Sequence, residues 1–244
     1  MRWQPEIRKL LDEVLQTAEF PRIAVFDADG TLWHNDLGES FFKYQIQNHL
    51  APGAHGIKDP WQHYENIKIR NHLVAYSWLA QINAKTPQAA LKNQCESFYK
   101  RHFNPGVADE MRELIKELTA CQFEVWICSA SIRWIIDEAA TDLGVPLDRV
   151  IAVETKVDSR GIITDEVMTP LPYKTGKKLC LERKLKELPT LVAGNSMGDL
   201  EMLTLAKKLS LVINFLPHLP EVRDSEESLV QEAATRGWPV QLFK

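Results

Sequence analysis

The chain has 244 residues, 45% of them hydrophobic, and a formal net charge of −4. This length and composition suit one large domain, or a domain with an insert. Acidic and basic residues are mixed along the sequence, and the lack of a basic stripe argues against a nucleic-acid-binding protein. No stretch approaches the roughly 18 uncharged apolar residues that a membrane-spanning helix needs.

The cysteines and the N-terminal segment favour a cytoplasmic protein. The four cysteines form no CxxC pair, which is typical of reduced, buried thiols rather than of a disulfide framework or a zinc site. Residues 1–16 are charged throughout and lack the apolar core of a secretory signal. The sequence contains no signal for a particular oligomeric state.

Short apolar segments predict the strands of a parallel sheet. They are rich in Val and Ile and lie at 22–26, 123–128, 150–153, 190–193 and 209–214. Such runs are typical of strands buried on both faces. Helical patterns lie between them, at 108–120 and at 131–144, where Gly144 is a candidate C-cap. This alternation predicts a doubly wound α/β sheet that binds ligands at the carboxyl ends of its strands.

Residues 36–103 break this alternation. They contain no convincing strand but show helical patterns at 67–82 and 86–103, the second with Thr86 as a candidate N-cap. We therefore predict a smaller, mainly helical cap domain over 36–103 that covers the edge of the sheet. Residues 1–35 and 104–244 would form the catalytic core.

The sequence VFDADGTLW places two carboxylates, Asp27 and Asp29, directly after the first predicted strand. In an extended chain their side chains point to the same side, and they repel each other unless a cation lies nearby or one is protonated. Mg²⁺ suits such oxygen ligands and keeps coordination sites for a phosphate. One carboxylate would then attack phosphorus, and the other would act as general acid and base. The alternative is a turn-forming pair before Gly30.

Further segments offer the other groups that phosphate chemistry needs. Ser129 ends the second predicted strand with a hydroxyl for a phosphate oxygen. The segment YKTGKKL offers lysines at the start of a helix, with Lys177 favoured and Lys174 as the alternative. Asn195 and Asp199, four residues apart after another strand, offer oxygens for a metal site. Each has a common structural explanation alone, but their order along the chain favours a joint functional interpretation.

With these motifs the chain resembles the haloacid dehalogenase (HAD) superfamily. The resemblance covers the predicted core, through DADGTLW at 27–33, CSAS at 128–131, the lysine region at 174–178 and GNSMGDLEM at 194–202. The predicted insert between the first two motifs is similar to the cap of the phosphoserine phosphatase-like branch. The second aspartate speaks against a dehalogenase, and the absence of DKTG at the first motif speaks against a P-type ATPase.

The resemblance implies roles for individual residues. Asp27 would be the nucleophile, and Asp29 the acid and base whose backbone carbonyl also binds Mg²⁺. Ser129 would be the hydroxyl of the second motif. Asn195 and Asp199 would complete the metal site with the first two aspartates. Many family members carry aspartate where this chain has Asn195, which still offers an oxygen but brings one charge fewer.

We therefore expect a Mg²⁺-dependent phosphatase that acts on a small phosphorylated metabolite through an aspartyl-phosphate. A phosphotransferase with the same intermediate and a non-catalytic phospholigand-binding protein are the alternatives. Asp36 and Glu39, together with Trp33, Trp61 or Trp78, would hold a cationic substrate tail, as in phosphocholine, phosphoethanolamine or phosphoserine. The other interpretation is that these acids start a helix and that the tryptophans fill the core of the insert.

Overall fold

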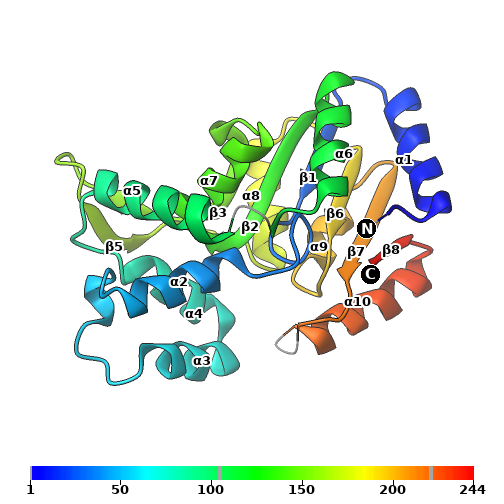
Figure 1. Cartoon of the computed structure of the whole chain (residues 1–244). Coiled ribbons are helices and arrows are strands. Elements are labelled where there is room, and N and C mark those ends of the chain that lie inside the picture. Colours follow the sequence, from blue (N-terminus) through cyan, green and yellow to red (C-terminus); the bar gives the residue numbers. More distant parts are fainter. Residues whose placement is uncertain (1, 104–105, 220–221) are drawn as a thin grey trace.

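A six-stranded sheet forms the centre of the computed structural model, which describes residues 2–103, 106–219 and 222–244 (Figure 1). The strand order is β3-β2-β1-β6-β7-β8, and all neighbours are parallel. The strands are β1 (Ile23–Phe26), β2 (Glu124–Ile132), β3 (Val150–Val153), β6 (Leu191–Gly194), β7 (Leu209–Phe215) and β8 (Val240–Phe243). The five predicted strands are confirmed. The edge strand β8 was missed, because its sequence VQLF is short and includes a polar residue.

Helices cover both faces of the sheet, since alternate side chains of a strand point to opposite sides. Phe26 packs in one hydrophobic cluster with helices α1 (Pro5–Thr17), α6 (Asp109–Ala120) and α7 (Arg133–Leu143). Val25 packs in the other cluster with helices α8 (Thr175–Lys184), α9 (Leu200–Leu203) and α10 (Arg223–Arg236). Helix α7 ends at Gly144 with φ of 74°, as predicted. The doubly wound α/β fold is confirmed.

The strand order changes direction at β1. Strands β2 and β3 continue on one side of it, and β6, β7 and β8 lie on the other. Such a reversal leaves a crevice beyond the carboxyl ends of the strands. Asp27 directly follows β1 at this point, and its N–H donates to the Ala193 carbonyl of β6 at 2.9 Å. The topology therefore places the first predicted catalytic residue at the mouth of the crevice.

The segment 36–103, called the insert below, is helical and lies to one side of the sheet (Figure 1). It comprises α2 (Leu37–Gln47), a 3₁₀ turn (Pro52–Ala54), α3 (Pro60–Arg70), α4 (His72–Gln81), α5 (Gln88–Phe98) and a π-helical turn (Tyr99–Phe103). The pattern at 67–82 proves to be two helices, because the Asn71 side chain accepts from the N–H groups of Leu73 and Val74 and starts α4. The predicted return to the core at residue 104 lies outside the described residues.

An antiparallel hairpin, β4 (Thr155–Val157) and β5 (Ile163–Val167), joins the core to the insert. The Ile163 N–H donates to the Thr86 carbonyl at 3.0 Å, and the Lys85 N–H donates to the Ile163 carbonyl at 2.8 Å. The N-cap of α5 is Pro87, which lacks a side-chain cap bond, and the buried Thr86 Oγ1 makes no hydrogen bond with the described residues. The prediction of Thr86 as N-cap is wrong.

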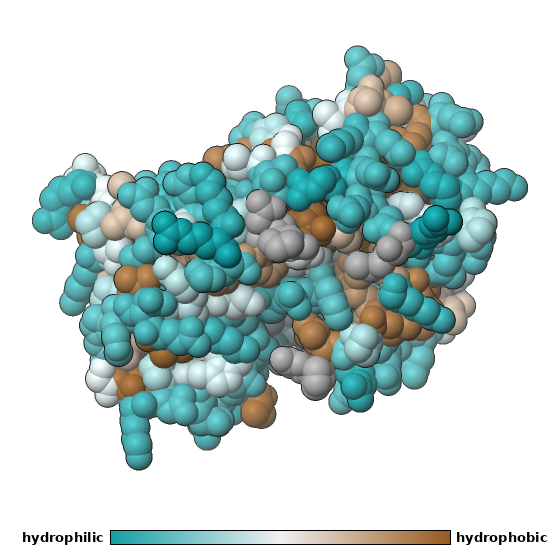
Figure 2. All heavy atoms as spheres, viewed as in Figure 1, coloured by the Kyte–Doolittle hydropathy of each residue, from teal (hydrophilic) through white to brown (hydrophobic). Residues whose placement is uncertain are grey.

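The surface in Figure 2 is mostly hydrophilic, with hydrophobic residues in scattered small groups. This distribution fits a chain that packs its apolar side chains between a sheet and its helices. Within the ranges that the structure describes, no helix has both the length and the apolar character needed to cross a membrane.

Candidate active site

Most predicted site residues line one cavity of about 110 Å³ at the carboxyl ends of the strands. The loops after β1 and β6, the end of β2 and the start of α8 bring them together, as the topology requires. The cavity is smaller than the roughly 300–1,000 Å³ of pockets for drug-sized ligands, so it suits a small ligand. The predicted residues in its lining are Asp27, Asp29, Asp36, Ser129, Lys177, Asn195 and Asp199.

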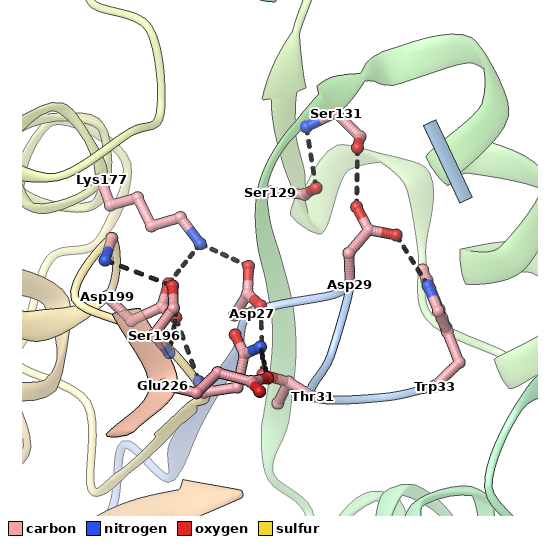
Figure 3. A network of polar contacts seen from close by, with 12 residues as sticks. Asp27, Asp29, Thr31, Trp33, Ser129, Ser131, Lys177, Ser196, Asp199 and Glu226 are labelled. Atoms are coloured by element: carbon pink, nitrogen blue, oxygen red, sulfur yellow. Dashed lines mark hydrogen bonds and ion pairs between the residues drawn. The ribbon is translucent and has the colours of Figure 1, made fainter. Parts of the chain in front are cut away.

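Lys177 lies between two buried carboxylates. Its ammonium donates to Asp27 Oδ1 and, at 2.6 Å, to Asp199 Oδ1 (Figure 3). Thr31 Oγ1 donates to the other oxygen of Asp27 at 3.1 Å. Burial and the charge of Asp199 raise the pKa of Asp27 to about 7, although Lys177 acts in the opposite direction. The cation thus offsets the repulsion of two carboxylates that would otherwise be unpaired.

The alternative lysine, Lys174, lies outside this network. It is exposed, precedes α8 with a left-handed φ of 51°, and does not line the cavity. Its ammonium lies 5.5 Å from the centre of the Tyr173 ring. The structure therefore places the favoured lysine, Lys177, beside Asp27.

Asp29 directs its carboxylate away from Lys177, toward the end of β2 and the insert (Figure 3). Oδ1 accepts from Trp33 Nε1 and from the Leu37 N–H, both at 2.7 Å, and Oδ2 accepts from the Ser131 hydroxyl at 2.6 Å. Burial raises the pKa of Asp29, although these hydrogen bonds stabilise the charged form. A raised pKa is what a carboxyl group needs to act as a general acid near neutral pH.

Ser129 presents its hydroxyl to the same cavity. Its Oγ accepts from the Ser131 N–H at 3.0 Å, so its hydroxyl hydrogen can still be donated to a phosphate oxygen. Sequence reasoning missed Ser131, which holds Asp29. The available signal was the spacing of the two serines, because residues two apart on an extended strand point to one side.

Asn195 and Asp199 form a tight turn after β6. Asp199 Oδ2 accepts from the N–H groups of Asn195 and Ser196, both at 3.1 Å. Asn195 Nδ2 donates to Glu226 Oε1 at 2.8 Å. Gly30 packs against this amide, with φ of 79°, and a Cβ at residue 30 would lie 2.0 Å from Nδ2. Both the backbone conformation and the close approach therefore require glycine in the DADG motif.

The oxygens in this cavity fit Mg²⁺. Asp27, Asp199 and Asn195 offer hard oxygen ligands, which Mg²⁺ combines with waters and phosphate oxygens. In the described part of the chain, no three His, Cys, Asp or Glu side chains form a metal-binding group. The Asp29 carboxylate is turned toward Ser131, and Asn195 contributes an amide. The Asp29 contribution would therefore be its backbone carbonyl, as the family resemblance implies.

The two acidic residues expected to meet the substrate lie in different surroundings. Asp36 lines the cavity, and its Oδ1 caps α2 by accepting from the Glu39 N–H at 2.7 Å. Glu39 is buried outside the cavity lining, where it accepts from the Tyr64 hydroxyl at 2.9 Å and pairs with the Lys68 ammonium. This pair compensates the charge of Glu39, which the structure places apart from the predicted residues that line the cavity.

None of the three tryptophans lines the cavity. Trp33 is fully buried, and Trp61 and Trp78 pack around Phe42 in the insert with ring centroids 6.1 and 5.5 Å away. Two tyrosines that the sequence analysis did not single out line the cavity instead. Tyr76 of α4 and Tyr173 before α8 meet edge to face, with centroids 5.2 Å apart.

Sequence comparison now identifies the family. The profile of haloacid dehalogenase-like hydrolases matches residues 24–204, which is more than half of the chain. The chain belongs to the haloacid dehalogenase-like hydrolase family. This match confirms the family resemblance and the prediction of an enzyme of the hydrolase class. No curated protein matches the sequence.

Solved structures share the fold at low identity. A conserved functionally unknown protein from Anaerococcus prevotii is similar with a TM-score of 0.73 and 16% identity, over 98% of this chain and 92% of that one. A phosphoserine phosphohydrolase-like protein from Francisella tularensis has a TM-score of 0.57 and 19% identity, over 86% of this chain and 92% of that one. A phosphoserine phosphatase with a phospho-aspartyl intermediate analogue has a TM-score of 0.53 and 18% identity, over 88% of this chain and 98% of that one. These likenesses show a shared fold.

Proposed function

We propose that this HAD-like hydrolase is a Mg²⁺-dependent phosphomonoester phosphatase that forms an aspartyl-phosphate on Asp27. The main support is the environment of Asp27 at the end of β1. Lys177 and Thr31 each hold one of its carboxylate oxygens, and the Ser129 hydroxyl faces the same small cavity. A positioned carboxylate with phosphate-binding donors around it is the arrangement that nucleophilic attack on phosphorus requires.

The reaction would proceed in two displacements. An oxygen of Asp27 forms a bond to phosphorus, the bond to the substrate's ester oxygen breaks, and Asp29 gives that oxygen a proton. Asp29 then takes a proton from water, whose oxygen attacks the same phosphorus and releases phosphate, restoring the Asp27 carboxylate. Lys177 and the Ser129 hydroxyl would stabilise the charge on the phosphoryl oxygens. Asp27, Asn195, Asp199 and the Asp29 carbonyl would hold Mg²⁺, which would supply further charge neutralisation.

The helical insert would act as the cap that selects the substrate. It contributes Asp36 and Tyr76 to the cavity, where Tyr76 packs against the core residue Tyr173. Tyrosine rings attract an ammonium group through their faces, and a carboxylate adds charge attraction. We propose a small phosphorylated metabolite as substrate and place amino-alcohol phosphates, such as phosphoethanolamine, phosphocholine or phosphoserine, first among them. The cytoplasm is the proposed location.

A metabolite screen with controlled metal tests this function. We expect release of inorganic phosphate from a small phosphomonoester in Mg²⁺, loss of activity in EDTA, and recovery on adding Mg²⁺. Ca²⁺ should be a poor substitute, because its coordination is larger and looser. Parallel reactions with alcohol acceptors measure phosphoryl transfer. Full activity after exhaustive chelation would contradict the proposed role of Mg²⁺. Phosphoryl transfer to the alcohol in excess of hydrolysis would make the chain a phosphotransferase.

A further inference from the structure

Behind Asn195 lies a buried carboxylate that the proposed reaction does not use. Glu226, in the first turn of α10, is only 4% exposed. Its Oε1 accepts from Asn195 Nδ2 at 2.8 Å, and its Oε2 lies 2.6 Å from His218 Nδ1. Burying a carboxylate is costly unless specific partners hold it, so these two contacts define where its charge lies.

The contact with Glu226 fixes which way the Asn195 amide faces. A carboxylate only accepts hydrogen bonds, so the amide nitrogen must be the atom that points to Glu226. Within the described residues no group donates to Asn195 Oδ1, and Asn195 lines the active-site cavity. The amide oxygen is therefore the atom left for the cavity.

Glu226 also changes the charge at this corner of the site. Asparagine offers an oxygen without a formal charge, whereas the group one hydrogen bond behind it is a carboxylate, which also contacts His218 Nδ1. An N–H that donates to a carboxylate is polarised, which leaves more negative charge on the amide oxygen and makes it a better metal ligand. The first turn of α10 suits this carboxylate, since a helix N-terminus favours negative charge.

We propose that Glu226 is a positioning residue for Mg²⁺, acting through the Asn195 amide. It orients the amide oxygen toward the metal and supplies, from behind, negative charge that asparagine lacks. The inference rests on the proposed function, because it takes Mg²⁺ as the metal of the cavity. Glu226 itself touches neither substrate nor metal.

Calorimetric titration with Mg²⁺ alone tests this role without relying on turnover. Glu226→Gln keeps the shape and one acceptor oxygen but removes the charge, and it should weaken Mg²⁺ binding about 10- to 100-fold. Glu227→Gln is the matched control, because Glu227 is the exposed neighbour on the same turn, and it should bind Mg²⁺ like the wild type. Wild-type affinity in Glu226→Gln would overturn the proposal.

A second pair of variants separates positioning from a general loss of structure. Asn195→Asp alone sets two carboxylates against each other, so it should bind Mg²⁺ poorly and unfold at lower temperature. Combining it with Glu226→Gln moves the negative charge from residue 226 to residue 195, next to the metal. The double variant should bind Mg²⁺ at least about 10-fold more tightly than either single variant. Should Glu226→Gln fail to fold, the comparison of Asn195→Asp with the double variant still decides.

The controls distinguish this inference from the function on which it rests. A wild type that neither binds Mg²⁺ nor hydrolyses phosphomonoesters would reject the proposed function, and the role of Glu226 with it. A wild type that does both, together with a double variant no better than the single variants, would reject only the positioning role.

Discussion

The hydroxyl of Ser131 donates a 2.6 Å hydrogen bond to Asp29 Oδ2. This bond ties the bulged end of β2 to the loop that follows β1. The other oxygen of Asp29 accepts from the N–H of Leu37, the first residue of α2. The proposed acid and base is therefore held by the catalytic core on one side and by the insert on the other.

Ser131→Ala should move the pH profile of the enzyme. The variant removes a hydrogen bond that stabilises the Asp29 carboxylate, so the pKa of Asp29 should rise further. We expect the alkaline limb of the kcat/KM profile to shift to higher pH, because Asp29 would then stay protonated longer. Ser131→Thr, which keeps the hydroxyl, is the control. A rate loss equal at all pH values would mean that Ser131 only supports the loop.

Asp27→Asn should abolish phosphatase turnover while leaving the fold intact. The amide is nearly isosteric with the carboxylate but is a poor nucleophile, so kcat should fall by at least about 1,000-fold. Circular dichroism checks the fold, and acid-quenched protein from reactions with ³²P-labelled substrate should carry label only in the wild type. Turnover near the wild-type rate would remove Asp27 from the role of nucleophile.

The two lysines provide a matched test of the phosphate-binding role. Lys177→Met leaves Asp27 and Asp199 facing each other without a cation. It should cost about 3–5 kcal/mol in the free energy of unfolding measured in EDTA and about 100- to 1,000-fold in kcat/KM. Mg²⁺ should restore part of the stability, because it supplies positive charge. Lys174→Met, at an exposed position, should stay within about twofold of the wild type in kcat/KM.

The metal-free protein should lose stability as the pH rises. The pKa of Asp27 is about 7 in the fold and 3.8 ordinarily, so folding favours the protonated form. That stabilisation is complete below pH 3.8 and is lost as the pH rises through about 7. Urea unfolding in EDTA should therefore give a smaller free energy at pH 8 than at pH 5, by on the order of a few kcal/mol.

Two controls connect this pH effect to the site. Asp27→Asn has no proton to lose there, so its stability should change less between pH 5 and pH 8. Mg²⁺ should stabilise the wild type more at pH 8, where the carboxylate is ionised, than at pH 5. Equal stability of the metal-free wild type at both pH values would show that Asp27 is already ionised in the fold.

The sequence predicted the features that depend on the local pattern of apolar and polar residues. Five of the six strands of the sheet follow from their apolar runs, and Asp27, Ser129 and Asn195 follow from the rule that ligands lie at the carboxyl ends of parallel strands. Long-range packing was beyond this reasoning. Nothing in the local sequence at Glu226 indicates that it meets Asn195, 31 residues away, and Glu39 next to the nucleophile loop gave no sign of its pairing with Lys68, 29 residues away.

The last prediction concerns recognition of a cationic substrate. Asp36 lines the cavity, so Asp36→Asn should raise KM for an amino-alcohol phosphate, with a loss of about 5- to 30-fold in kcat/KM. Asparagine is as good an N-cap as aspartate, which keeps the start of α2 intact. An uncharged substrate such as p-nitrophenyl phosphate should be affected much less, because it has no positive tail.

Glu39→Gln serves as the contrasting variant. Glu39 pairs with Lys68 inside the insert, so its loss should lower the melting temperature and slow both substrates to a similar degree. A larger loss of activity on the cationic substrate than on the uncharged one should appear only in Asp36→Asn. If Asp36→Asn slows the cationic and the uncharged substrate equally, ammonium recognition at this carboxylate is rejected, because a charge contact with the tail would separate the two substrates.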